Sequence, residues 1–222
     1  MIDYRTDLSK RENLIHFIKV TQQLIETDGI QGVSTRKIAA ISGFHNSTIY
    51  FYFKDLHELI MLASIKRFQK YTDTLESLSR NTDSYENFYA IWTCFAESAF
   101  QYPCIFYNFF FGKYGDDLPL FLNVYYDLFP DKRRHYSADI ESMFYGKNYT
   151  ERCRKILLPL IGDARTRVTQ HNIDTVTDIT VCFTKSLLSQ KCETPSLDSR
   201  PLQNSMLAML HLVIDREDPA SP

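Results

Sequence analysis

The residues best suited to binding chemistry lie between Ser34 and Lys54, in the stretch STRKIAAISGFHNSTIYFYFK. This stretch has three basic side chains, Arg36, Lys37 and Lys54, and no acidic one. The rest of the chain holds all 27 acidic residues and the remaining 22 of the 25 basic residues. A locally positive strip on a chain of net charge −2 suits the neutralisation of phosphate groups.

Short polar side chains follow in the same stretch. His45, Asn46, Ser47 and Thr48 are mostly hydrogen-bonding groups. Such side chains can reach the edges of bases when the N-terminus of their helix points into a DNA groove. A cluster of Ser, Thr and Asn is equally typical of a solvated turn, so this pattern alone leaves both interpretations open.

Aromatic residues complete the stretch. Tyr50 and Tyr52 could donate their hydroxyl groups to phosphate oxygens. The alternative for the run from Tyr50 to Phe53 is packing in the core, and we expect at least Phe53 to be buried.

Three positions predict how this stretch folds. Ala39 is small where two helices must cross closely, and Gly43 allows the positive φ of a tight turn. Ile49 is apolar six residues later and can bury a second helix against the first. Ser34 is suited to be the N-cap of the first helix, and the second should run from about His45 to Tyr52. This spacing is typical of a helix-turn-helix, whose second helix lies in the major groove.

The remaining sequence has helical periodicity almost throughout. The first helix should begin at Ser9, since Ser9 and Glu12 have the spacing of a capping box, and end at Gly29 in the left-handed conformation. A longer helix starts near Asp55. Further helices are expected over 83–101, 103–111, 117–129, 132–145, 149–169, 173–190 and 198–214. No run alternates with period two, so the fold class is predicted to be all-α.

Composition excludes several other classes. Apolar residues make up 44% and charged residues 23%, which predicts a real core and not a disordered chain. Seven Gly and eight Pro are few for a β-sandwich or a glycine-loop nucleotide fold. No apolar run approaches ~18 residues, so we expect no membrane-spanning helix and no membrane partner. The first seven residues mix both charge signs, which is untypical of a secretory signal.

Cysteine and histidine usage predicts neither a disulfide framework nor a metal site. The count of five cysteines is odd, and no Cys-x-x-Cys pair is present. The six histidines are scattered without the spacing of metal ligands. The simplest compartment is therefore the reducing cytoplasm, and we expect no cofactor.

With these residues in view, the stretch Ser-Thr-Arg-Lys-Ile-Ala…Gly-Phe…Ser-Thr-Ile-Tyr-Phe-Tyr-Phe-Lys resembles the N-terminal domain of the TetR family of bacterial transcriptional regulators. The resemblance covers roughly residues 9–62. It implies a three-helix DNA-binding domain over 1–54 and a helical effector-binding and dimerisation domain over 55–222. It also implies an Ω-shaped homodimer that binds double-stranded DNA at a palindromic operator.

The resemblance assigns roles to individual positions. Ser34 and Thr35 would hold the backbone at the start of the second helix, and Arg36 would contact a base or a phosphate. Asn46, Ser47 and Thr48 would contact the operator, with His45 at the edge of this surface. Tyr50 and Tyr52 would contact phosphates. The family commonly has Lys at the position of Leu56, where it binds phosphate; Leu56 cannot do this, and Lys54 is the candidate substitute.

The second domain has a dense aromatic segment. Residues 100–129 hold twelve of the chain's aromatic side chains, interrupted by Gly112, Gly115 and Pro119. This pattern is typical of a wall around an apolar cavity, with tyrosine hydroxyls as polar groups, although aromatic stripes at helical spacing are usually core. The candidate ligand-binding residues are Trp92, Phe95, Phe106, Tyr107, Phe110, Tyr125 and Tyr126. No basic cluster in this segment suggests a highly anionic ligand, so a hydrophobic effector is favoured.

The last two helices are predicted to form the dimer interface. Their apolar positions could also pack inside the subunit, but a two-fold four-helix bundle would bury them and pair two basic strips. The candidate interface residues are Val176, Ile179, Phe183, Leu187, Leu202, Met206, Met209, Leu210 and Val213.

Three functional hypotheses follow. The first is a repressor released from its operator by a small, largely apolar effector. The second keeps DNA binding but gives the body a protein partner, as in a coactivator or architectural factor; a solid aromatic core would favour it, and a cavity of ~300 Å³ or more would favour the first. The third is an enzyme using Asp116 and Asp117, but adjacent helical residues point apart and no catalytic motif is present, so we expect no catalysis.

Overall fold

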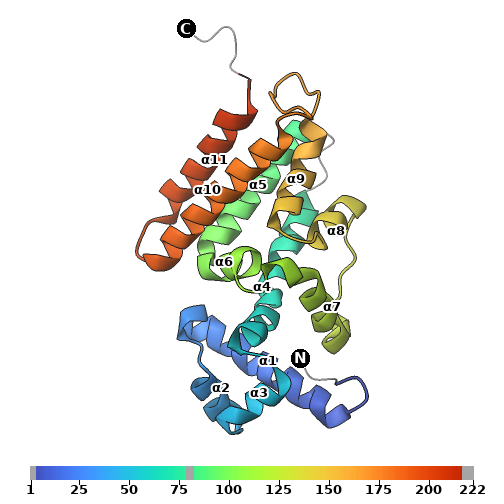
Figure 1. Ribbon diagram of the computed structural model, residues 1–222, viewed down its shortest axis with the longest axis vertical. Coiled ribbons are helices and arrows are strands. Elements are labelled where there is room, and N and C mark those ends of the chain that lie inside the picture. Colours follow the sequence, from blue (N-terminus) through green and yellow to red (C-terminus); the bar gives the residue numbers. More distant parts are fainter. Residues whose placement is uncertain (1–3, 79–82, 217–222) are drawn as a thin grey trace.

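The computed structural model describes residues 4–78 and 83–216, and within them the chain is helical without a strand. The predicted all-α class is therefore confirmed. The α-helices are α1 (Leu8–Asp28), α2 (Thr35–Ser42), α3 (Ile49–Tyr52), α4 (Leu56–Leu78), α5 (Ser84–Gln101), α6 (Pro103–Phe111), α7 (Leu118–Leu128), α8 (Ala138–Phe144), α9 (Tyr149–Leu157), α10 (Ile173–Glu193) and α11 (Ser199–Ile214). Short 3-10 turns join several of them. Figure 1 shows α1–α3 gathered at one end and α10 and α11 side by side at the other.

The N-terminal head is built around α1. Leu14, Phe17 and Ile18 on this helix have no exposed surface. The Phe17 ring lies 5.0 Å from that of Phe44 and 6.2 Å from that of Phe53, centroid to centroid. This aromatic contact holds the two short helices α2 and α3 against α1, because both rings come from the segments that flank α3.

The ends of α1 differ in detail from the prediction. The N-cap is Asp7 and not Ser9: an Asp7 carboxylate oxygen accepts a hydrogen bond from the Lys10 amide at 3.1 Å. A carboxylate is the better acceptor because its negative charge also meets the positive end of the helix dipole. Gly29 does take a positive φ of 71°, but its ψ of 169° is extended and not left-handed helical.

Helix α4 joins the head to the C-terminal body, and Figure 1 shows it running from one to the other. Its residues Leu59 and Leu62 are fully buried on the head side, and Phe68 is buried farther along. α4 packs against α1 in the head and against α5, α6, α7 and α8 in the body. The proposed domain boundary at residue 54 remains a prediction, since the core continues through this helix.

Two predicted helices are too long. The segment before α8 is not helical, because Tyr136 donates its hydroxyl to Asp73 at 2.8 Å and the Ser137 amide donates to Glu76 at 2.9 Å. These bonds to α4 hold it in a non-helical conformation. The helix predicted over 149–169 ends with a 3-10 turn at Leu158–Leu160, where Pro159 and then Gly162, with a φ of 87°, break it. The other predicted helices match the structure within a few residues.

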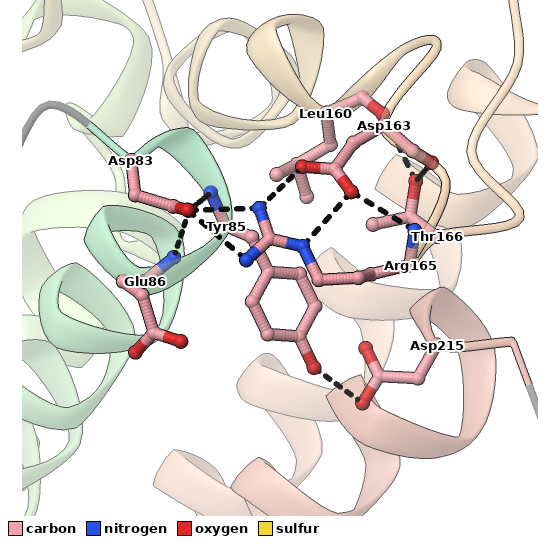
Figure 2. A network of polar contacts seen from close by, with 8 residues as sticks. All are labelled: Asp83, Tyr85, Glu86, Leu160, Asp163, Arg165, Thr166 and Asp215. Carbon is pink, nitrogen blue, oxygen red and sulfur yellow. Dashed lines mark hydrogen bonds and ion pairs between the residues drawn. The ribbon is translucent and has the colours of Figure 1, made fainter. Parts of the chain in front are cut away.

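A polar network connects the N-terminal end of α5 to the loop before α10 and to the C-terminal end of α11 (Figure 2). The Arg165 guanidinium lies between two carboxylates, 2.9 Å from Asp83 and 2.6 Å from Asp163. Asp83 is at the same time the N-cap of α5. Tyr85 stacks under Arg165 at 4.5 Å and donates its hydroxyl to Asp215, at the end of α11, at 3.0 Å. The network therefore sets the position of α11 relative to α5.

We predict that this network makes the stability of the chain depend on pH in the acid range. Hydrogen bonds from the Arg165 side chain and amide lower the pKa of Asp163 from 3.8 to about 2. Because the folded pKa is depressed, the stabilisation is complete above the unfolded value and is lost as the pH falls through the folded value. Urea titrations should show a constant difference in unfolding free energy between wild type and Asp163→Asn above ~pH 4, shrinking toward pH 2. Asp178→Asn, at an exposed site, is the control; a difference that persists undiminished at low pH would contradict the prediction.

Candidate nucleic-acid interface and interior of the body

The turn between α2 and α3 has the predicted geometry. Gly43 has φ 76° and ψ 14°, the left-handed conformation, and its amide donates to the Ala39 carbonyl at 3.0 Å. The Phe44 amide bonds to the same carbonyl at 3.2 Å. Ala39 is 5% exposed and Ile49 is fully buried, so the two helices cross at these positions, as their sizes predict. The segment is a helix-turn-helix.

The second helix of this motif starts as a 3-10 turn over Asn46–Thr48 and continues as α3; we call Asn46–Tyr52 the recognition helix. His45 is its N-cap: the Nδ1 atom accepts from the Ser47 amide at 3.3 Å and lies 2.8 Å from the Ser47 hydroxyl oxygen. This bond requires the tautomer that carries its proton on Nε2. His45 therefore shapes the start of the helix and still presents an N–H donor.

The recognition helix presents its polar side chains outward. His45, Asn46 and Ser47 are exposed, and Thr48 is half-buried. The Tyr50 side chain is 57% exposed. These are the positions at which the sequence predicted contacts to bases and phosphates, and the structure brings all of them to one end of the head.

The basic residues of the strip differ in their surroundings. Arg36 is exposed near the start of α2, and no carboxylate among the described residues forms an ion pair with it. Lys37 forms an ion pair with Asp28 at 2.6 Å, which reduces its availability to an outside phosphate. Ser34 caps α2 by accepting from the Lys37 amide at 3.3 Å, as predicted, and Thr35 is half-buried beside it. Arg36 is therefore the more available charge of the two at this helix start.

Tyr52 is held in place by the head core. Its hydroxyl oxygen accepts from the Asn13 side-chain amide at 2.9 Å, and its ring lies 5.4 Å from that of Phe17. The hydroxyl hydrogen remains available to an acceptor outside the protein. Sequence reasoning missed Asn13, because its position on α1 reveals no contact with a residue 39 positions away.

Phe51 is the second residue that sequence reasoning missed. The aromatic run suggested core packing, and Phe53 is indeed buried with 1% exposure, but Phe51 is 72% exposed. The signal was present in the spacing: Phe51 comes three residues after Thr48 and four after Ser47, so it continues their helix face. The exposed surface of the recognition helix thus carries an apolar ring among its polar groups.

Lys54 and Leu56 lie at the junction between the recognition helix and α4, and only one of them is exposed to solvent. Leu56 packs against the hydrophobic core, which agrees with its inability to bind phosphate, and Lys54 is exposed. The Lys54 amide donates to the buried Glu58 carboxylate at 2.6 Å. The exposed ammonium group at this junction is therefore that of Lys54, and its role as the substitute contact remains a prediction.

Asp55 connects the head to the body at the same junction. One carboxylate oxygen caps α4 by accepting from the Glu58 amide at 2.9 Å. The other accepts from the Lys113 ammonium and, at 3.0 Å, from the Tyr114 hydroxyl, both in the loop after α6. Burial works to raise the pKa of Asp55, but the hydrogen bonds from Lys113, Glu58 and Tyr114 outweigh it and hold that pKa below its usual value. Asp55 is thus ionised at neutral pH and ties α4 to the body.

The aromatic interior of the body is nearly filled. A cavity of about 20 Å³, the size of one water molecule, lies between α4, α5, α6, α8 and α9. Three predicted ligand-binding residues, Trp92, Phe95 and Phe110, border it. This volume is far below the ~300 Å³ expected for a formed effector site.

The other predicted ligand residues lie elsewhere. Tyr107 borders an open surface pocket of about 360 Å³, and Phe106 borders another of about 210 Å³. Tyr125 and Tyr126 are buried, with 3% and 2% exposure, and pack against neighbouring aromatic rings. The structure therefore divides the seven candidates among separate places.

The predicted interface residues of α10 and α11 also divide into two groups. Ile179 is 41% exposed, and Phe183 and Val213 are half-buried. The remaining six are buried within the single chain, at 9% exposure or less: Val176, Leu187, Leu202, Met206, Met209 and Leu210. Met206 and Leu210 have no exposed surface and pack inside the subunit, so these two cannot contact a second copy in this conformation. On α11 the large apolar side chain that points outward is Leu212, at 72% exposure.

Three further observations concern the described part of the chain. No helix there has the combination of length and apolar character that crossing a lipid bilayer requires. Among the same residues, no three or more His, Cys, Asp or Glu side chains gather as metal ligands would. All five cysteines are free thiols.

No protein-family model matches this sequence, and no curated protein matches it. Solved structures do resemble it. A transcriptional regulator from Rhodococcus sp. Rha1 matches 92% of this chain and 99% of its own at 13% identity, with a TM-score of 0.54. FadR from Thermus thermophilus, a TetR-family transcriptional repressor solved with lauroyl-CoA, matches 94% and 99% at 14% identity, with a TM-score of 0.54. SmeT, solved with triclosan, matches 96% and 95% at 14% identity, with a TM-score of 0.50. The chain has the fold of TetR-family transcriptional regulators.

Proposed function

We propose that this chain is a TetR-family transcriptional regulator, a homodimer that binds a palindromic operator in the cytoplasm. Its simplest mode of action is repression, relieved when a small, largely apolar effector binds in the body. The observation that carries the proposal is the outward recognition helix Asn46–Tyr52, set by a helix-turn-helix beside the basic start of α2. That combination supplies both groups for bases and charge for phosphates.

Each polar residue of the head has a role in this proposal. The N-terminus of α2, where Ser34 is the cap and Thr35 the first residue, faces a phosphate, because a helix N-terminus attracts anions. Arg36 contacts a base or phosphate. Bases are contacted by Asn46, Ser47 and Thr48, with His45 at the edge, and phosphates by Tyr50, Tyr52 and Lys54. In the dimer, two recognition helices ~34–36 Å apart enter successive major grooves.

Helix α4 is the proposed lever between effector and DNA. It is buried in both the head and the body, and Asp55 ties its start to the loop that carries Lys113 and Tyr114. A movement of that loop would therefore shift the start of α4 and the recognition helix before it. The effector needs only a different affinity for the two states, and a coupling of ~1–3 kcal/mol is typical.

The effector hypothesis is supported by neighbours of the same fold, since FadR was solved with lauroyl-CoA and SmeT with triclosan. In this chain the cavity beside Trp92, Phe95 and Phe110 has a volume of about 20 Å³, so an effector that binds there has to open the body to enter. The filled interior is also the specific observation that favours the second candidate function. In that case the body binds a protein partner, and the chain is a DNA-binding coactivator or architectural factor.

We place the dimer interface on the outer faces of α10 and α11. Ile179 and Leu212 are large apolar side chains left exposed, at 41% and 72%, on two helices that pack side by side. Cys182 and Ala208 are exposed and uncharged on the same helices. A second copy related by a two-fold axis would cover these residues in a four-helix bundle.

DNA binding tests the proposal directly. Sites are selected from a randomised duplex pool with the purified dimer, and affinity is measured by fluorescence anisotropy at several salt concentrations. Arg36→Ala should cost ~1–3 kcal/mol on the selected site if Arg36 contacts guanine.

Lys54→Ala should reduce the slope of log K against log salt by about one per subunit. Lys70→Ala, exposed on the body part of α4, is the control. Selected DNA bound no better than random DNA by the wild type would refute the proposal.

The dimer interface has its own test. Leu212→Arg and Ile179→Glu each bring a charge into the proposed apolar contact, and burial of an unpaired charge is costly. Sedimentation equilibrium should therefore show a dimeric wild type and largely monomeric variants. Leu120→Arg, at a site 64% exposed on α7, serves as the matched substitution and should stay dimeric. Variants that associate as tightly as the wild type would exclude this face.

A further inference from the structure

Arg152 is a buried cation, and the neighbouring Glu151 carboxylate attracts it without forming an ion pair with it. It lies on α9 and is 4% exposed. Its Nη2 atom donates to the carbonyls of Phe144 at 2.7 Å and Gly146 at 2.9 Å, and its Nε atom has no hydrogen-bond partner. Among the described residues, no carboxylate forms an ion pair with it. Burial of a charge in this position costs free energy unless an anion or hydrogen-bond acceptors compensate it.

The surroundings of Arg152 are aromatic. Its guanidinium carbon lies 5.4 Å from the centroid of the Phe68 ring and 5.8 Å from that of Phe110. Burial lowers the pKa of Arg152 to about 10, so the side chain still carries its charge at neutral pH. Ring faces compensate a cation only in part. The site therefore holds a positive charge among aromatic side chains.

Two more donors border the same 20 Å³ cavity. The indole Nε1 of Trp92 is buried without a hydrogen-bond partner among the described residues. The Tyr149 hydroxyl is also buried and makes no hydrogen bond of normal geometry, although the Thr184 and Cys153 side chains lie close enough to act on it. The Trp92 and Tyr149 side chains are 2% and 5% exposed. Cys153 also borders the cavity, and burial raises the pKa of its thiol to about 12, so it stays protonated and neutral. Arg152, Trp92 and Tyr149 all line this cavity, and each has a donor atom without a hydrogen bond of normal geometry. Such a donor set matches an acceptor that carries negative charge.

A purely structural role explains only part of this arrangement. The two Nη2 bonds of Arg152 satisfy carbonyls at the C-terminal end of α8, and a cation is favourable there. Gly146 makes room for the side chain, since a Cβ at that position would lie 2.9 Å from the Arg152 Cγ. Neither contact accounts for the unpaired Nε, nor for the Trp92 and Tyr149 donors at the same cavity.

We propose that this cavity takes the oxyanion head of an otherwise apolar ligand, with Arg152, Tyr149 and Trp92 as its hydrogen-bond donors. The inference rests on the proposed function, because it names the chemical class of the effector. It refines the expectation of a small, largely apolar effector by adding one anionic group. The sequence expectation considered residues 100–129, and Arg152 lies outside that segment. The apolar remainder of the ligand enters by displacing Met143, Ile91 and Ile156, which line the cavity. Met143 has a flexible side chain and lies on the short helix α8, so we expect it to move aside most easily of the three.

The test uses the fact that Trp92 is the only tryptophan of the chain. Energy transfer from Trp92 reports the binding of 8-anilino-1-naphthalenesulfonate and of its uncharged counterpart N-phenyl-1-naphthylamine, without DNA present. The wild type should bind the sulfonate about tenfold or more tightly than the neutral dye. Arg152→Gln should remove that preference and leave the affinity for the neutral dye within about twofold. Arg154→Gln, an exposed arginine two residues on, should change neither affinity.

Thermal unfolding followed by circular dichroism checks that each variant folds. If Arg152→Gln does not, Tyr149→Phe carries the test: it should weaken sulfonate binding several-fold and neutral binding not at all. Equal affinity of the wild type for both dyes, or equal weakening of both by the variants, would overturn the proposal. Because no DNA is present, that result leaves the DNA-binding function untouched. A failure of operator binding, in turn, leaves the anion preference standing.

Discussion

Helix α4 is buried in both the head and the body, and this constraint governs the rest of the structure. Its first turns complete the core of the head around Phe17 and Leu62, and its later turns enter the aromatic interior of the body at Phe68. A rigid element shared in this way cannot move in one core without disturbing the other. The position of the recognition helix is therefore determined by packing in the body as well as in the head. Asp55 strengthens the link at the point where the two meet.

The head was largely predictable because its geometry depends on short-range chemistry. The cap at Ser34, the positive φ of Gly43 and the burial of Ile49 all follow from residue type and spacing. The body was less predictable. The segment before α8 is not helical because Tyr136 and Ser137 bond to α4, more than 60 positions earlier, and no local pattern reveals such a bond. Long-range hydrogen bonds override propensity there.

The limits on predicting the two candidate sites have the same origin. α11 has apolar residues on more than one face, so periodicity could not decide whether Met206 or Leu212 points outward; packing against α5 and α10 decides it. Arg152 stands in an ordinary charged stretch, Glu151 to Lys155, and would be taken for a solvated helix face. Only the fold brings its guanidinium next to the Phe68 and Phe110 rings, where the charge is buried and not solvated.

The exposure of Phe51 has a thermodynamic consequence. A ring that is 72% exposed on the recognition helix keeps ordered water around it in the free protein. In the DNA-bound state that we propose, the ring and the neighbouring Tyr50 leave water, and removal of apolar surface gives a negative heat-capacity change on association. The enthalpy of association would then become more favourable with rising temperature. Two forces of different physical origin would act on this one helix, since counterion release is weakened by salt and burial of an aromatic ring is not.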